Sequence, residues 1–147
     1  MSRIVVGIDG SEGSKHALAW AAEEARLRDA SLMLIEAWQL PVGAYGGMGW
    51  SGIGTEMVED LRTNTEQRLD EICSEFSAPL EGLTVERKVV NGAAAPALLE
   101  AAAGADLLVV GTRGHGGFAG LLLGSVSQQC THHSPCPVVI IPPIQNR

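Results

Sequence analysis

Two short groups of glycine, serine and arginine residues in the last third of the chain could together bind a phosphate group. Gly111-Thr-Arg-Gly114 comes first, nine residues follow, and the second group is Gly124-Ser125-Val126-Ser127. Glycines let the backbone approach a ligand closely, and the unpaired N–H groups and dipole of a helix N-terminus attract phosphate. Ser125 and Ser127 add hydroxyl donors, and Arg113 adds a positive charge. The spacing predicts a phosphate-binding loop; the alternative is a plain strand-to-helix connection capped by Ser125.

A carboxylate follows the first apolar run of the chain. Residues 4–8 are apolar except for Gly7, and Asp9 comes directly after them. At the carboxyl end of a central strand, such a carboxylate can accept hydrogen bonds from ribose hydroxyls. The same side chain could instead cap the helix that follows. Asp9 is therefore a candidate nucleoside-binding residue with a structural alternative.

The elements that must position these residues alternate between strand and helix. Short apolar runs predict strands, and apolar residues at helical spacing predict amphipathic helices between them. Five strands alternating with four helices specify a parallel, doubly wound α/β sheet, in which ligands bind beyond the carboxyl ends of the strands. The predicted strands are residues 4–8, 32–38, 84–90, 107–110 and 138–141, and the predicted helices lie within 11–29, 55–76, 96–104 and 125–133.

The segment from Gln39 to Gly54 is longer than most strand-to-helix loops and holds six glycines. Loops of this length are uncommon without a function. It is a candidate lid or partner-docking loop, and a solvent-exposed linker is the equal alternative.

Length and charge exclude several classes of protein. A chain of 147 residues suits a single domain spanning 1–147, and a net charge of −7 lacks the basic footprint of proteins that bind nucleic acid or anionic membranes. No apolar run reaches the ~18 residues of a membrane span. Three cysteines form an odd set, which favours reduced thiols and a soluble cytoplasmic protein.

The glycine motif resembles the signature of a known family. G-x2-G-x9-G-[S/T], as it stands between Gly111 and Ser125, is similar to the ATP-binding signature of the universal stress protein family. VVGIDGS near the N-terminus and HSPCPVVIIP near the C-terminus also resemble that family, so the resemblance covers essentially the whole chain. It implies a Rossmann-like fold similar to the adenine nucleotide alpha hydrolases, with strand order 3-2-1-4-5, a homodimer, and ATP bound with a metal ion such as Mg²⁺ or Mn²⁺.

The resemblance also implies roles for individual residues. The adenosine end of the ligand would contact the Gly7 backbone and Asp9, and adenine would contact the main chain of Ala37. The phosphates would lie against Gly111, Arg113, Gly114, Gly124, Ser125, Val126 and Ser127.

The expected function is that of an ATP-binding regulator or sensor in a stress response, acting on a downstream protein that the sequence does not identify. No G-x4-G-K-[S/T] motif supplies a phosphate-binding lysine, and no catalytic residue is predicted. Two alternatives remain, a slow ATPase or nucleotidyl-transfer enzyme and a nucleotide-free homodimeric scaffold. The apolar strand at 138–141 is expected at a sheet edge, where it could pair with a second copy of the chain.

Overall fold

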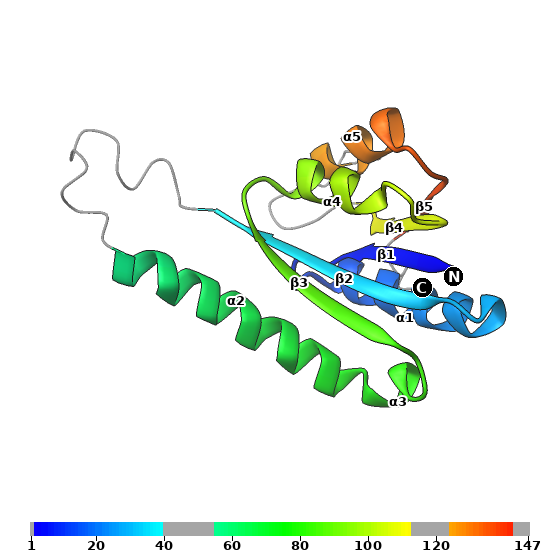
Figure 1. Ribbon diagram of the computed structural model, residues 1–147, viewed down its shortest axis with the longest axis horizontal. Helices are drawn as coiled ribbons and strands as arrows, with labels where there is room; N and C mark the ends of the chain where they lie inside the picture. Colours follow the sequence, from blue (N-terminus) through cyan, green and yellow to red (C-terminus); the bar gives the residue numbers. More distant parts are fainter. Residues whose placement is uncertain (1, 40–54, 113–123, 143–147) are drawn as a thin grey trace, which may run out of the picture.

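A computed structural model of the chain describes residues 2–39, 55–112 and 124–142 (Figure 1). The candidate lid from Gln39 to Gly54 lies outside the described residues except for Gln39 itself. Two of the predicted phosphate-binding residues, Arg113 and Gly114, also lie outside them.

The core of the fold is one sheet of five parallel strands in the order β3-β2-β1-β4-β5. This confirms the doubly wound sheet and its strand order. β1 is central, and β3 and β5 form the two edges. The strands are β1 (Arg3–Gly7), β2 (Ser31–Trp38), β3 (Val85–Asn91), β4 (Leu107–Gly111) and β5 (Val138–Ile141).

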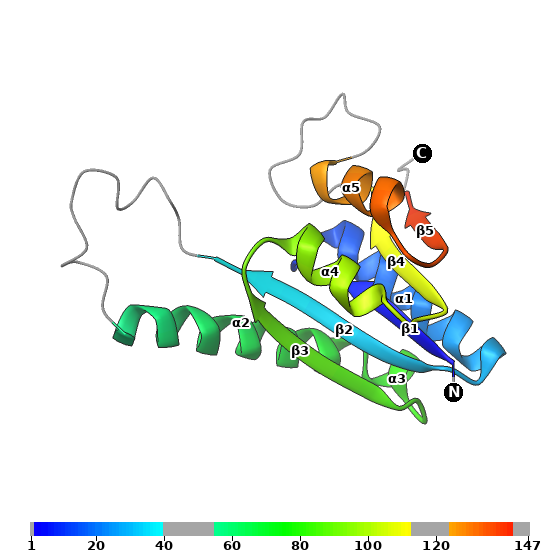
Figure 2. The same cartoon turned by 45° about the horizontal axis from the view of Figure 1, so that its top comes forward.

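Helices cover both faces of the sheet (Figures 1 and 2). α1 and α2 pack on one face, and α4 and α5 pack on the other. The helices of the described residues are α1 (Glu12–Arg28), α2 (Thr55–Glu75), α3 (Ser77–Leu80), α4 (Ala94–Ala102) and α5 (Ser125–His133).

The alternation of side chains along β1 explains why helices must cover both faces of the sheet. Ile4 and Val6 point into the core under α1, whereas Val5 points into the core under α4, and all three are fully buried. Successive side chains of a strand point to opposite faces, so a strand that is apolar throughout must be covered on both.

The sequence predicted four helices, and α3 is a fifth. It is a single turn at the reversal between α2 and β3, and Pro79 is its third residue. Proline is tolerated there because the first turn of a helix leaves its amides without intrahelical acceptors. Four residues are too few to show helical periodicity. Among the helices of the described residues, none is both long and apolar enough to cross a membrane.

Candidate functional site

The carboxyl ends of β1, β2 and β4 meet at one edge of the sheet. Gly7 is the last residue of β1, Ala37 is the penultimate residue of β2, and Gly111 is the last residue of β4. β1 lies between β2 and β4, so these three sequence-predicted residues belong to adjacent strands at a common edge. These three residues thus lie at the edge where doubly wound folds bind ligands.

Asp9 lies in a tight turn that connects β1 to α1. Its Oδ1 accepts hydrogen bonds from the backbone amide of Ser11, at 2.9 Å, and from the Ser11 hydroxyl. The amide of Asp9 donates to Ser14 Oγ at 3.3 Å. Ser11 is the N-cap of α1, and its Oγ accepts from the Ser14 amide. Asp9 therefore orients the capping residue rather than capping the helix itself.

Gly10 allows this turn to form. Its φ of +81° lies in the left-handed region, which glycine adopts without the steric cost that a Cβ brings. The turn places the Asp9 carboxylate, which is partly buried, at the end of the central strand.

A close backbone contact brings the Asp9 turn and the end of β4 together. A Cβ built on Gly111 would lie 3.1 Å from both the carbonyl carbon and the oxygen of Gly13, in the first turn of α1. Only a glycine fits there without a shift of backbone. The first turn of α1 therefore contacts Gly111 on one side and, through Ser11, holds Asp9 on the other.

The N-terminus of α5 begins beside the end of β4. Gly124 is its N-cap, and no side chain makes a capping hydrogen bond there within the part of the chain that the structure describes. The Gly124 amide donates to the carbonyl of Thr112 at 2.6 Å, which ties the helix start to the residue after β4. The amides at the start of a helix have no intrahelical acceptor, so this end can bind an anion.

The three residues after Gly124 differ in their exposure to solvent. Ser125 is exposed, Val126 is partly buried, and Ser127 is buried. Ser127 Oγ lies 2.8 Å from the carbonyl oxygen of Thr112 and 3.1 Å from that of Gly124. A hydroxyl has one proton, and here it is directed to the protein's own backbone. Ser127 thus holds the helix start in position, and Ser125 presents its hydroxyl at the surface.

Sequence reasoning missed an ion pair at the same edge. Glu36, on β2 directly before Ala37, is fully buried, and its carboxylate pairs with the guanidinium of Arg68 on α2. A single carboxylate within an apolar strand run was the available signal. Its partner could not be identified from the sequence, because 32 residues separate the two.

The thiols are not placed for metal binding within the described residues. No group of three or more His, Cys, Asp or Glu side chains there could hold a metal ion. Burial raises the pKa of the Cys130 thiol to about 11. Burial also raises the pKa of Cys73, and the nearby Arg87 partly opposes that rise. Thiols with raised pKa values are protonated and unreactive at neutral pH.

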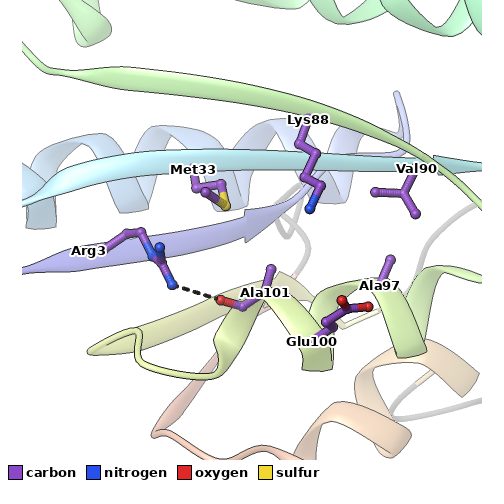
Figure 3. A pocket seen from close by; sticks show the side chains of 7 residues that line it. All are labelled: Arg3, Met33, Lys88, Val90, Ala97, Glu100 and Ala101. Atoms are coloured by element: carbon purple, nitrogen blue, oxygen red, sulfur yellow. Dashed lines mark hydrogen bonds between the residues drawn. The ribbon is translucent and has the colours of Figure 1, made fainter.

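A cavity of about 240 Å³ lies elsewhere, between α4 and the strands β2 and β3 (Figure 3). Arg3, at the start of β1, and Lys88, on β3, line it together with Glu100 of α4. Arg3 donates to the carbonyls of Ala101 and Ala103 near the end of α4. None of the predicted site residues lines this cavity, so it is separate from the site at the carboxyl edge.

Comparisons with known proteins agree with one another. The family model described as "Universal stress protein family" matches residues 1–142. A universal stress protein of Thermus aquaticus is 36% identical over 141 residues, which cover 94% of this chain and 96% of the relative. A universal stress protein of Mycolicibacterium smegmatis is 30% identical over 138 residues, covering 94% of this chain and 47% of the relative. The chain thus spans about half the length of several curated relatives that it matches.

Solved structures of similar fold include proteins with bound nucleotides. A universal stress protein in complex with cAMP is 32% identical, with a TM-score of 0.65 and 95% of each chain covered. An Arabidopsis thaliana family member with AMP bound is 20% identical, with a TM-score of 0.65 and coverage of 98% of this chain and 93% of that one. An Archaeoglobus fulgidus universal stress protein in complex with dAMP is 23% identical, with a TM-score of 0.62 and coverage of 96% and 98%.

The family match extends over almost the whole chain, one relative matches along nearly its full length, and the sheet has the expected strand order. The chain therefore belongs to the universal stress protein family.

Proposed function

We propose that this chain binds an adenine nucleotide at the carboxyl edge of its sheet and acts as a nucleotide-dependent regulator in a stress response. The observation that carries the proposal is the N-terminus of α5, which no side chain caps within the described residues. It stands beside Gly111 and is linked through the first turn of α1 to Asp9. An anion-binding group and a carboxylate suited to ribose thus lie at one edge.

The relatives support an adenine nucleotide as the ligand class. A relative at 32% identity was solved with cAMP, and proteins of the same fold were solved with AMP and dAMP. ATP is the specific ligand that we propose, because the glycine motif is similar to the family's ATP-binding signature.

Each candidate residue has a place in this proposal. The Gly7 backbone and Asp9 would bind the adenosine end, and the main chain of Ala37 would contact adenine. The phosphates would lie against Gly111, the α5 amides of Ser125 and Val126, and the Arg113 to Gly114 segment. Gly124 and Ser127 hold the start of α5 against Thr112 and so keep these amides in position.

A divalent cation, Mg²⁺ or Mn²⁺, would enter with the nucleotide, neutralising charge on the phosphates. The oxygens of the phosphates themselves are ligands that both ions accept.

We further propose a cytoplasmic homodimer that pairs through β5 and presents the nucleotide state to a downstream protein. β5 is an edge strand, and all four of its residues are partly buried by their own core. Within the described residues, no strand pairs with the outer edge of β5. Such an edge can pair with a second copy of the chain.

The experiment that tests the function is identification of the nucleotide carried by freshly purified protein. The protein is desalted and denatured, and the released small molecules are identified by mass spectrometry. We expect an adenine nucleotide in an amount approaching one per chain. If none is released, and added ATP with Mg²⁺ gives no binding heat, the proposed function is wrong. Incubation of the complex for hours, with analysis for ADP and AMP, separates a binder from a slow ATPase.

A further inference from the structure

The Glu36–Arg68 ion pair joins three elements at the edge that we assign to the nucleotide. Glu36 stands on β2, one residue before Ala37, and its side chain is 0% exposed. Arg68 comes from α2, and its side chain is 49% exposed. Removing a carboxylate from water is costly unless a cation and hydrogen bonds compensate it. Arg68 supplies a cation that pairs with the buried carboxylate of Glu36.

Arg68 also lies over the Asp9 turn. A Cβ built on Gly10 would be 3.2 Å from Arg68 Cδ and 3.4 Å from Arg68 Nε, so the side chain rests directly against this glycine. Gly10 stands between Asp9 and Ser11, whose amide and hydroxyl both donate to the Asp9 carboxylate. The arginine that neutralises Glu36 therefore also covers the backbone of the turn that orients Asp9.

Two features show that Arg68 differs from Arg62, the other arginine of α2. Arg62 pairs with Glu66 one turn along the same helix, and both side chains are more than half exposed. Such an exposed pair contributes little to stability. Arg68 instead reaches a buried partner on a different element and packs on a third element. Its position is consequently fixed by tertiary contacts.

We propose that Arg68, anchored by Glu36, is a positioning residue that holds the Asp9 turn so that Asp9 can recognise the 2′-hydroxyl of the ribose of the bound nucleotide. This inference rests on the proposed function and deepens it, because it assigns the selectivity for a ribonucleotide to a contact between α2 and the Asp9 turn. A site that is built to hydrogen-bond a hydroxyl discriminates against the analogue that lacks it, provided that its own groups are held in place.

The test compares AMP with dAMP, which differ only in the 2′-hydroxyl. The variant is the double replacement E36Q/R68A, which removes the cover over Gly10 without leaving a buried carboxylate unpaired. R68A alone is the second variant. R62A is the matched control, because it removes an arginine from the same helix that contacts neither Glu36 nor Gly10. Affinities for both nucleotides are measured by isothermal titration calorimetry, and folding is checked by circular dichroism and thermal unfolding.

We expect the wild type and R62A to bind AMP more tightly than dAMP by about tenfold, roughly the effect of one hydrogen bond to a charged group. In E36Q/R68A the affinity for AMP should fall about tenfold while that for dAMP changes by less than about threefold, so that the preference disappears. A general loss of structure would lower the affinities for both nucleotides equally. The comparison of AMP with dAMP therefore separates a positioning role of Arg68 from a purely structural one.

Every other outcome of this experiment rejects either the proposed function or the positioning role of Arg68. If the wild type binds neither nucleotide nor ATP, the proposed function fails and this inference fails with it. If the wild type binds both but does not prefer AMP, or if folded E36Q/R68A keeps the wild-type preference or loses both affinities equally, Arg68 is not a positioning residue. In these last cases the proposed function stands.

Discussion

The hydroxyl of Ser127 lies 2.8 Å from the carbonyl oxygen of Thr112 and donates to it. This bond connects the first turn of α5 to the residue that follows β4, and the Gly124 amide donates to the same oxygen. The start of α5 is therefore held next to the end of β4 by internal hydrogen bonds. The sequence motif places two serines here, Ser125 and Ser127, but the structure separates their roles.

The first prediction concerns Ser127. Ser127→Ala removes a buried hydrogen bond and should lower the free energy of unfolding by about 1–2 kcal/mol. It should also weaken ATP binding, because the amides of α5 lose their support. Ser125→Ala, at an exposed position, should change stability by less than about 0.5 kcal/mol. Urea denaturation checks both values. Equal stabilities of the Ser127→Ala variant and the wild type would show that the bond to Thr112 has no structural role.

The second prediction concerns Gly111. In Gly111→Ala the new Cβ would meet the Gly13 backbone at 3.1 Å, so β4 and α1 must move apart. We expect a loss of about 1–3 kcal/mol in stability and a weakened site for ATP, because overpacking shifts backbone.

Gly104→Ala is the control for this variant. Gly104 has a φ of +81° but open space where a Cβ would be, and it follows α4, away from the site. Gly104→Ala should lower the free energy of unfolding by about 1–2 kcal/mol through backbone strain alone. It should leave the affinity for ATP unchanged. If Gly111→Ala binds ATP as tightly as this control does, the contact between Gly111 and Gly13 is not needed for the site.

The third prediction tests the dimer. In the parallel register of β4 with β5, Thr112 donates to Ile141 and Leu108 donates to Pro137, so the amide of Ile140 points away from β4. Ile140→Pro removes this outward donor and should convert a dimer to a monomer. Ile140→Ala loses most of the side chain but keeps the amide, and it should remain dimeric. Light scattering after size-exclusion chromatography measures the masses. A dimer that survives in folded Ile140→Pro would exclude β5 as the interface.

The fourth prediction concerns pH. Burial raises the pKa of Cys130 to about 11 in the folded state, against 9.0 as the ordinary value. Between these two values the unfolded chain has lost the proton and the folded chain keeps it. Stability from this group is therefore fully present below pH 9 and is lost as pH rises toward 11. Thermal unfolding is measured at pH 7 and pH 10. The melting temperature should fall more between these two pH values for the wild type than for Cys130→Ala. Equal falls in melting temperature for the two proteins would contradict a raised pKa of Cys130 in the folded state.

The sequence was sufficient to predict the sheet because its strands are short apolar runs bounded by clear turns. Residues 107–110 and 138–141 were predicted as strands, and the structure has Leu107–Gly111 and Val138–Ile141. The edge strand β3 is displaced by one residue from its predicted bounds of 84–90. The central strand β1 is also displaced by one residue, from 4–8 to Arg3–Gly7, because hydropathy marks the existence of a strand better than its end residues.

The parts that could not be predicted depend on tertiary contacts. α3 was missed because one turn has no period, and the Glu36–Arg68 pair was missed because nothing local connects the two residues. The role of Ser127 was also incomplete in the sequence interpretation. A helix-start serine can face a ligand or its own backbone, and only the position of Thr112 shows that its hydroxyl is used internally.

The measurement that tests the central claim most directly is a titration of isotope-labelled protein with ATP and Mg²⁺, followed through the backbone amide resonances. The account predicts large shifts for Gly111, Ser125 and Val126 and none for Lys88 and Glu100, which line the separate cavity under α4. Shifts confined to Lys88 and Glu100, or no shifts at millimolar ATP, would contradict nucleotide binding at the carboxyl edge.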